Sequence, residues 1–93
     1  MNRLEQDWAV VLKLDGSVRR FQFEGLKLRL AKGAYYTPDF LVFKDDGSIE
    51  LHETKGFMRE AARVRLLGAA ELYPEFQFVL VKKIKKRWNI ERI

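Results

Sequence analysis

The sequence contains no cysteine and a single histidine, His52, among its 93 residues. Without cysteine, disulfide frameworks, thiolate metal sites and cysteine nucleophiles are excluded, and one histidine excludes any site that needs two. The longest apolar runs, such as Trp8–Leu12 and Leu66–Ala70, are far too short to cross a bilayer, and the N-terminus lacks a signal-peptide hydrophobic segment. We therefore expect a cytoplasmic protein with no membrane partner.

Negative charge is scarce in residues 82–93, whereas the rest of the chain is balanced. The whole chain has 18 Lys and Arg against 13 Asp and Glu, a net charge of +5. The C-terminal stretch holds one anion, Glu91, and six cations: Lys82, Lys83, Lys85, Lys86, Arg87 and Arg92. With 47% hydrophobic residues the chain is too apolar to be disordered. We expect one domain over residues 1–93 with a basic tail from about residue 82, a pattern that suits a polyanionic partner bound along one edge.

Hydrophobic periodicity predicts two helices, over residues 2–14 and 57–73. It predicts strands over residues 19–24, 26–30, 36–43, 49–55 and 76–81, and residues 88–93 fit either a last edge strand or a frayed tail. In the second helix we expect an inward face made of Phe57, Ala61, Val64, Leu67 and Leu72. The order α-β-β-β-β-α-β predicts an α/β fold with a central mixed sheet flanked by helices.

An Asp-Gly pair between two extended runs predicts a β-hairpin around residues 44–48. A three-residue loop, residues 45–47, puts its glycine in the left-handed conformation and pairs Phe43 with Ile49. A two-residue loop would place Phe43 opposite the charged Glu50 and break the match of apolar faces. We therefore prefer the three-residue loop.

The preferred register places Asp39 opposite Glu53, and Lys55 lies on the same face two residues further along. Two adjacent carboxylates repel unless a cation lies between them, and their oxygens suit Mg²⁺ or Mn²⁺. Such a metal would activate water and neutralise charge on a phosphodiester, while Lys55 positions the water or stabilises developing negative charge. The alternative is a solvated cross-strand cluster of two carboxylates and one lysine, because short acidic patterns recur by chance.

Pro38-Asp39, followed on the next strand by Glu53-Thr54-Lys55 and then by a helix, resembles the signature of the PD-(D/E)XK nuclease superfamily. The wider sequence, over roughly residues 1–82, resembles small bacteriophage and prophage proteins of this class. Five segments carry the resemblance: Leu26–Ala31, Tyr36–Val42, Glu53–Gly56, Ala61–Val64 and Ala70–Phe76. The resemblance implies a restriction-endonuclease-like core and DNA as the partner.

By this resemblance Asp39 and Glu53 bind the metal, Lys55 is the catalytic lysine, and the backbone carbonyl of Thr54 is a further ligand. Many members of the superfamily carry a glutamate on the first helix that completes the site, and Glu5 matches that position. Glu5 is equally explained as a first-turn glutamate that interacts with the helix dipole. The first helical region is also shorter than in larger phage relatives.

Two groups of cations are candidates for binding phosphate. The basic run Lys82, Lys83, Lys85, Lys86 and Arg87 would supply sequence-independent affinity, with a solubilising tail as its alternative. Arg59 and Arg63 lie four residues apart on the helix after the motif, with a solvated helix face as their alternative. His52 is out of phase with Asp39 and Glu53, so we expect it on the other face of the sheet in a structural role.

The resemblance thus predicts a Mg²⁺- or Mn²⁺-dependent endodeoxyribonuclease that hydrolyses DNA phosphodiester bonds. One small domain offers little surface to DNA, which favours a homodimer, and a symmetric dimer would suit branched, Holliday-junction-like DNA. Two alternatives stay open. One is a catalytically inactive nucleic-acid-binding accessory protein of a phage replication, recombination or packaging system, and the other is a protein-interaction module of a phage complex.

Overall fold

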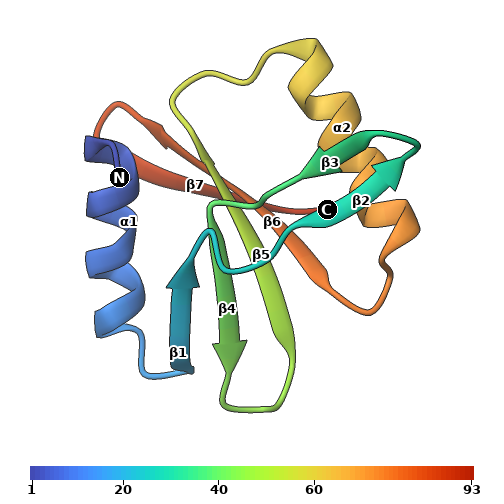
Figure 1. The fold of residues 1–93 in the computed structure, drawn as a ribbon. Helices are drawn as coiled ribbons and strands as arrows, with labels where there is room; N and C mark the ends of the chain where they lie inside the picture. The colour runs from blue at the N-terminus through green and yellow to red at the C-terminus, as the bar shows by residue number, and fades with distance from the viewer.

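The computed structural model describes residues 1–93 as two helices and seven strands (Figure 1). Their order is α1 (Arg3–Leu14), β1 (Val18–Phe23), β2 (Leu28–Ala31), β3 (Ala34–Tyr36), β4 (Phe40–Lys44), β5 (Ile49–Lys55), α2 (Glu60–Leu72), β6 (Gln77–Ile84) and β7 (Arg87–Arg92). Five strands form one sheet in the order β1-β4-β5-β6-β7, and β2 and β3 form a separate hairpin. Only β5 and β6 are parallel, so the predicted mixed central sheet with flanking helices is confirmed.

The two faces of the sheet carry separate hydrophobic clusters. On one face, Trp8, Ala9 and Leu12 of α1 pack against sheet residues that include Phe40 and Val81. On the other face, α2 and the β2–β3 hairpin cover a second cluster: Leu28, Leu41, Leu51, Leu66, Ala69, Phe78 and Leu80. Neither helix combines the length and apolar character needed to cross a membrane.

The predicted element order is wrong at two places. Residues 36–43 are not one strand, because β3 ends at Tyr36 and β4 begins at Phe40. Between them lies Pro38, which has no N–H to donate to a neighbouring strand and therefore interrupts the ladder. At the C-terminus, β6 continues to Ile84 and turns into β7, so residues 88–92 belong to an edge strand and are not a frayed tail.

The predicted inward face of the second helix is also wrong. The helix begins at Glu60, and Phe57, Ala61, Val64, Leu67 and Leu72 are all exposed. The buried residues are Leu66 and Ala69, which contact the sheet. Both sides of α2 carry apolar or small residues, so periodicity alone does not decide which side is buried. The side that packs on the sheet is the one with Leu66 and Ala69, where the small side chain of Ala69 permits the helix to approach the sheet closely.

The hairpin register is confirmed. Phe43 pairs with Ile49 and Leu41 with Leu51, and the N–H of Lys44 donates to the carbonyl of Ser48 at 3.0 Å. Gly47 has φ of +89°, the left-handed conformation that a three-residue loop requires. The apolar alternation of both strands therefore selects the expected face of the sheet.

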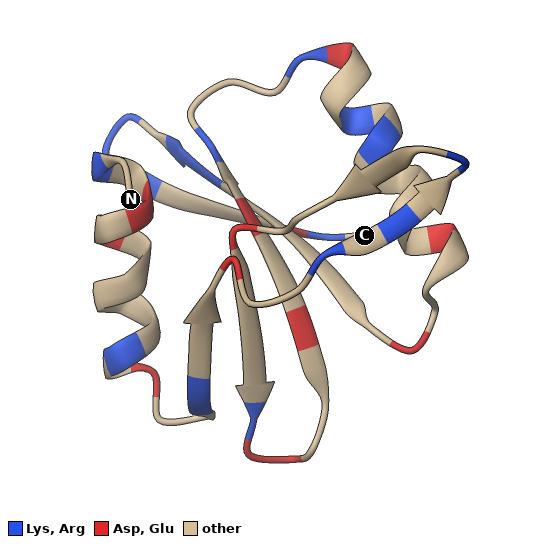
Figure 2. Cartoon of the chain, in the orientation of Figure 1, with Lys and Arg blue, Asp and Glu red and all other residues tan.

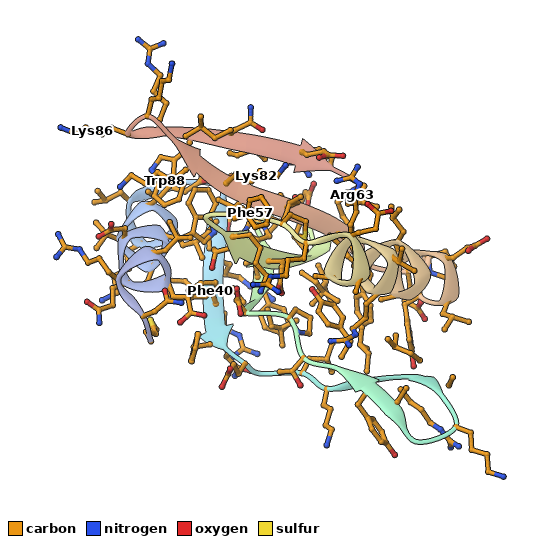
Figure 3. All side chains as sticks on the ribbon, turned by 90° about the horizontal axis from the view of Figure 1, so that it is seen from above. Phe40, Phe57, Arg63, Lys82, Lys86 and Trp88 are labelled. Atoms are coloured by element: carbon orange, nitrogen blue, oxygen red, sulfur yellow. The ribbon has the colours of Figure 1, made fainter.

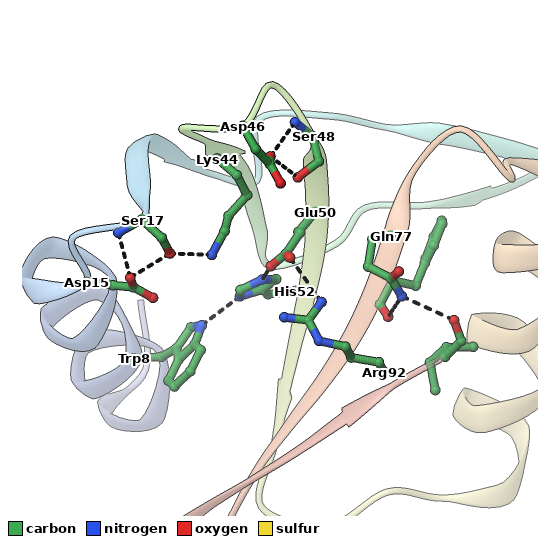
Figure 4. Close-up of polar contacts among 12 residues, drawn as sticks. Trp8, Asp15, Ser17, Lys44, Asp46, Ser48, Glu50, His52, Gln77 and Arg92 are labelled. Carbon is green, nitrogen blue, oxygen red and sulfur yellow. Dashed lines mark hydrogen bonds and ion pairs between the residues drawn. The ribbon is translucent and has the colours of Figure 1, made fainter.

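A hydrogen-bond network of side chains joins α1, β5 and β7 (Figure 4). The indole N–H of Trp8 donates to Nδ1 of His52 at 3.0 Å, and Nε2 of His52 lies 2.8 Å from Glu50. Because an indole is only a donor, Nδ1 is the acceptor and the proton resides on Nε2. Arg92 donates to the other oxygen of Glu50 at 3.0 Å. His52 thus has the expected structural position, facing α1.

Candidate active site

Asp39 lies one residue beyond the last β4–β5 pair, Phe40 with His52, and its side chain contacts Thr54. Oδ2 of Asp39 accepts two hydrogen bonds from Thr54, one from the backbone N–H and one from the hydroxyl, both at 2.8 Å. The carbonyl of Asp39 accepts from the N–H of Glu24 at 2.8 Å. The carboxylate of Asp39 therefore replaces the backbone acceptor that a continued β4–β5 ladder would offer to Thr54. Thr54 holds the side chain of Asp39, and Glu24 holds its backbone carbonyl.

Glu53 lies beside Asp39 and is only 8% exposed. Its Oε1 accepts a hydrogen bond from the hydroxyl of Tyr36 at 2.9 Å, and its Oε2 lies 3.2 Å from Nζ of Lys55. Lys55 remains partly open to solvent. The predicted cluster of Asp39, Glu53 and Lys55 at one end of the sheet is thus present, with Tyr36 as an additional member.

Excess negative charge marks this site. Burial, and after it the charge of Glu53, raises the pKa of Asp39 to about 6, even though the two Thr54 hydrogen bonds act in the opposite direction. Burial and the same glutamate raise the pKa of Tyr36 far above its ordinary value, so the phenol keeps its proton and donates a hydrogen bond to Glu53. A pair of carboxylates in this condition is stabilised by a cation.

The site offers a divalent cation only a small set of oxygen donors. No group of three or more His, Asp or Glu side chains is arranged to hold a metal ion. Oδ1 of Asp39 makes no hydrogen bond, whereas both oxygens of Glu53 have a partner. Continued beyond Phe40 and His52, the β4–β5 register sets Asp39 opposite Glu53 and Pro38 opposite Thr54, and since proline has no N–H it cannot donate to the carbonyl of Thr54. Two carboxylates and one carbonyl fit Mg²⁺, which keeps several waters.

Glu5 occupies the helix cap. Its carboxylate accepts from the N–H of Asn2 at 2.8 Å, and the side chain of Asn2 accepts from the N–H of Glu5 at 2.8 Å, a complete capping box. Its negative charge nevertheless contributes to the raised pKa of Asp39, after the effects of burial and Glu53. The geometry therefore gives Glu5 a capping role with an electrostatic influence on the site, and its membership of the site stays a prediction.

The basic run forms a hairpin at the same end of the sheet. In the parallel β5–β6 register Lys55 pairs with Lys82, and β6 then continues to the turn at Lys85 and Lys86. Figure 2 shows Lys and Arg on this turn, on the adjoining ends of β5 and β7, and at the start of α2. The acidic site therefore lies within a largely cationic end of the molecule.

The predicted cations differ in how free they are. Lys83 forms an ion pair with Asp7 at 3.3 Å and lies over the ring of Trp88, and Arg63 forms an ion pair with Glu91 at 2.8 Å. The other exposed cations, Lys85, Lys86, Arg87 and Arg59, make no ion pair. The hairpin tip and Arg59 are consequently the cations most available to an external anion.

Sequence reasoning missed two contacts of this site. Tyr36 was given no place in the site, and only the carbonyl of Thr54 was considered, not the hydroxyl that holds Asp39. The position of Tyr36, three residues before Asp39 on an extended segment, was the only available signal. In comparisons with known proteins, the chain matches no family model, no curated protein and no solved structure.

Proposed function

We propose that this protein is a Mg²⁺- or Mn²⁺-dependent endodeoxyribonuclease with a restriction-endonuclease-like core. The observation that carries the proposal is the pair of partly buried Asp39 and buried Glu53, with Lys55 3.2 Å from Glu53, near the cations of the β6–β7 turn. The two carboxylates would repel a DNA phosphate when no cation is bound, and a divalent cation between them would attract it. We take DNA as the partner because exposed cations at the β6–β7 turn and Arg59 make no ion pair and can contact a phosphate backbone.

Each residue has a distinct role in this proposal. Asp39, through its free Oδ1, and Glu53 would hold the cation together with the carbonyl of Thr54. When bound, the cation would supply an activated water and neutralise charge on the scissile phosphate. Thr54 keeps Asp39 oriented, and Tyr36 keeps Glu53 oriented. Lys55 would leave Glu53 to position the attacking water or to stabilise the charge that develops on the phosphate.

Cleavage assays test the proposal. Full-length protein is incubated with duplex, branched and single-stranded DNA, with Mg²⁺ or with a chelator. We expect metal-dependent cleavage that falls by at least about a hundredfold in Asp39→Asn and in Lys55→Met, the size of effect seen when one preorganised charged group is removed. Asp46→Asn, in the exposed β4–β5 turn, is the matched control and should cut like wild type. Equal trace activity in all variants would show that the site is not catalytic.

One observation favours a second function, a DNA-binding accessory protein that does no chemistry. Both oxygens of Glu53 already have partners, and no third acidic side chain completes a metal site. Such a protein would bind DNA with strong salt dependence and equally well with or without Mg²⁺. Binding that persists unchanged in Asp39→Asn, together with no cleavage by wild type, would select this second function.

A further inference from the structure

Phe57 is a large aromatic side chain that the fold does not use. It is 77% exposed and belongs to neither hydrophobic cluster. It lies on the short connection between the end of β5 at Lys55 and the start of α2 at Glu60. Because its ring is not packed in the core, it is free to contact the flat face of a ligand.

The surroundings of Phe57 select the chemistry of that ligand. Phe57 follows Lys55 by two residues, and Arg59 follows Phe57 by two; Lys82 pairs with Lys55 on the neighbouring strand. Figure 3, which looks down on this end of the sheet, places Phe57 and Lys82 in one region and Lys86 at the tip of the β6–β7 hairpin. A flat apolar ring bordered by cations matches a nucleobase attached to a phosphate backbone.

A second copy of this chain is the competing occupant, because Val64, Leu67 and Leu72 of α2 are also exposed. A symmetric contact centred on Phe57 would bring Lys55, Arg59 and Lys82 of each copy near the same cations of the other. Like charges in such a contact repel, whereas a phosphate backbone neutralises them. The local charge therefore favours nucleic acid over self-association at Phe57.

The distance to the acidic site restricts which base Phe57 can reach. Two residues of extended chain span at most about 7 Å, so Phe57 and Lys55 act on the same or adjacent nucleotides. In an intact duplex the faces of the bases are covered by stacking, and only an unpaired or displaced base offers its face to a side chain. We propose that Phe57 stacks on an unpaired base next to the scissile phosphate and gives the protein a preference for branched or gapped DNA. The placement of this base beside the scissile phosphate rests on the proposed nuclease function.

Binding of fluorescent DNA tests this inference separately from cleavage. The probes are a gapped duplex with 2-aminopurine as the unpaired base and an intact duplex with 2-aminopurine at the same position. Binding is measured in a chelator, by anisotropy and by 2-aminopurine emission, with wild type, Phe57→Ala and Phe57→Trp. Leu14→Ala is the control, since Leu14 is 81% exposed at the C-terminal end of α1.

We expect Phe57→Ala to lose about tenfold in affinity for the gapped probe, the lower range for removing one stacked base, and to change less than about twofold on the intact duplex. Phe57→Trp and Leu14→Ala should bind like wild type. The change in 2-aminopurine emission on binding should require an aromatic residue at position 57.

Four outcomes decide between the possibilities. Equal affinity and emission in wild type and Phe57→Ala would overturn the inference even if cleavage depends on Asp39. Loss of a dimer in Phe57→Ala during sedimentation, with emission unchanged, would also overturn it and identify a protein contact. Emission that depends on Phe57 without any cleavage by wild type would support the base-stacking site and reject the nuclease. Dependence of emission on Phe57 and of cleavage on Asp39 would support both.

Discussion

Asp39 is the residue on which the structure of the site depends. It stands where a strand residue would continue the β4–β5 ladder, but Pro38 before it has no N–H, and the side chain of Asp39 takes over the donors of Thr54. The same arrangement places its charge beside Glu53 in a half-buried position. The hydrogen bonds from Thr54 thus orient the carboxylate of Asp39, while burial beside Glu53 places its charge under electrostatic strain.

That strain predicts a pH-dependent gain in stability on removing the charge. The pKa of Asp39 is raised to about 6 in the folded protein, so the folded state holds this proton more tightly than the unfolded state. The free energy of unfolding therefore falls as the pH rises from about 4 to about 6, and the loss is complete above that range. Asp39→Asn, which keeps the shape and an oxygen acceptor for Thr54, should melt at a higher temperature than wild type at pH 7.5.

Thermal melts at pH 4 and pH 7.5 check this expectation. The advantage of Asp39→Asn should shrink at pH 4, where wild type is protonated, and added Mg²⁺ should raise the melting temperature of wild type only. Asp46→Asn is the control of opposite sign, because the hydrogen bonds from Ser48 lower the pKa of Asp46. A lower melting temperature for Asp39→Asn at pH 7.5 would mean that the Thr54 bonds outweigh the repulsion from Glu53.

The β4–β5 hairpin could be predicted from sequence, whereas the connection of Tyr36 to Glu53 could not. In the hairpin, apolar residues alternate on both strands and a glycine follows two aspartates, so local rules determine the register. Tyr36 reaches Glu53 only because β3 pairs with β2 outside the main sheet and passes over the end of β5. This contact joins residues 17 apart and depends on the path of the chain, which has no local signal.

The face of α2 was unpredictable for a different reason. Apolar residues lie on both sides of the helix, and the sheet buries the side with Leu66 and Ala69. Phe57 was expected to begin the inward face, but the helix starts three residues later, at Glu60. Because the predicted helix began three residues too early, Phe57 was assigned to its buried face, and its exposure beside the site was not predicted.

The β6–β7 turn combines a strained backbone with two cations. Lys85 and Lys86 have φ of +49° and +65°, the left-handed region that two-residue hairpin turns require and that Asn-Gly adopts most easily. Residues with a Cβ are disfavoured there by roughly 1–2 kcal/mol each. The presence of two lysines is therefore not explained by turn stability, and we propose that they bind an anion at the tip.

Replacing the turn with Lys85→Asn and Lys86→Gly should stabilise the protein by about 1–2 kcal/mol, because the strained backbone is relieved. Urea unfolding monitored by circular dichroism measures this change, with an unchanged slope against denaturant. The matched control, Lys85→Gln with Lys86→Gln, removes the same charges but keeps side chains in the left-handed region, and it should gain much less. Equal stability of the Asn-Gly and Gln-Gln variants would show that the lysines are not strained.

At the scale of the whole molecule, the net charge of +5 divides into a balanced body and a basic hairpin that is part of the sheet. Deleting residues 82–93 would remove β7 and the end of β6, together with the ion pairs of Arg63 with Glu91 and Arg92 with Glu50. Such a deletion would therefore disturb folding and could not isolate the effect of charge at the hairpin tip. Charge at the tip must instead be tested by substitutions that leave both strands intact.

The salt dependence of DNA binding gives this test. Each phosphate neutralised by a cation contributes roughly −0.9 to the slope of log K against log salt concentration on duplex DNA. If Lys85 and Lys86 each contact a phosphate, the Gln-Gln variant should bind more weakly at low salt, with a slope less steep by about 2. A charge-matched control replaces Lys13 and Arg19, exposed cations at the end of α1 and the start of β1, with glutamine. Anisotropy titrations at several salt concentrations measure all three proteins. Equal slopes for both double variants would mean that DNA responds to net charge alone, whereas a smaller slope only for the tip would place the phosphate backbone along the β6–β7 hairpin, beside Lys55 and Lys82.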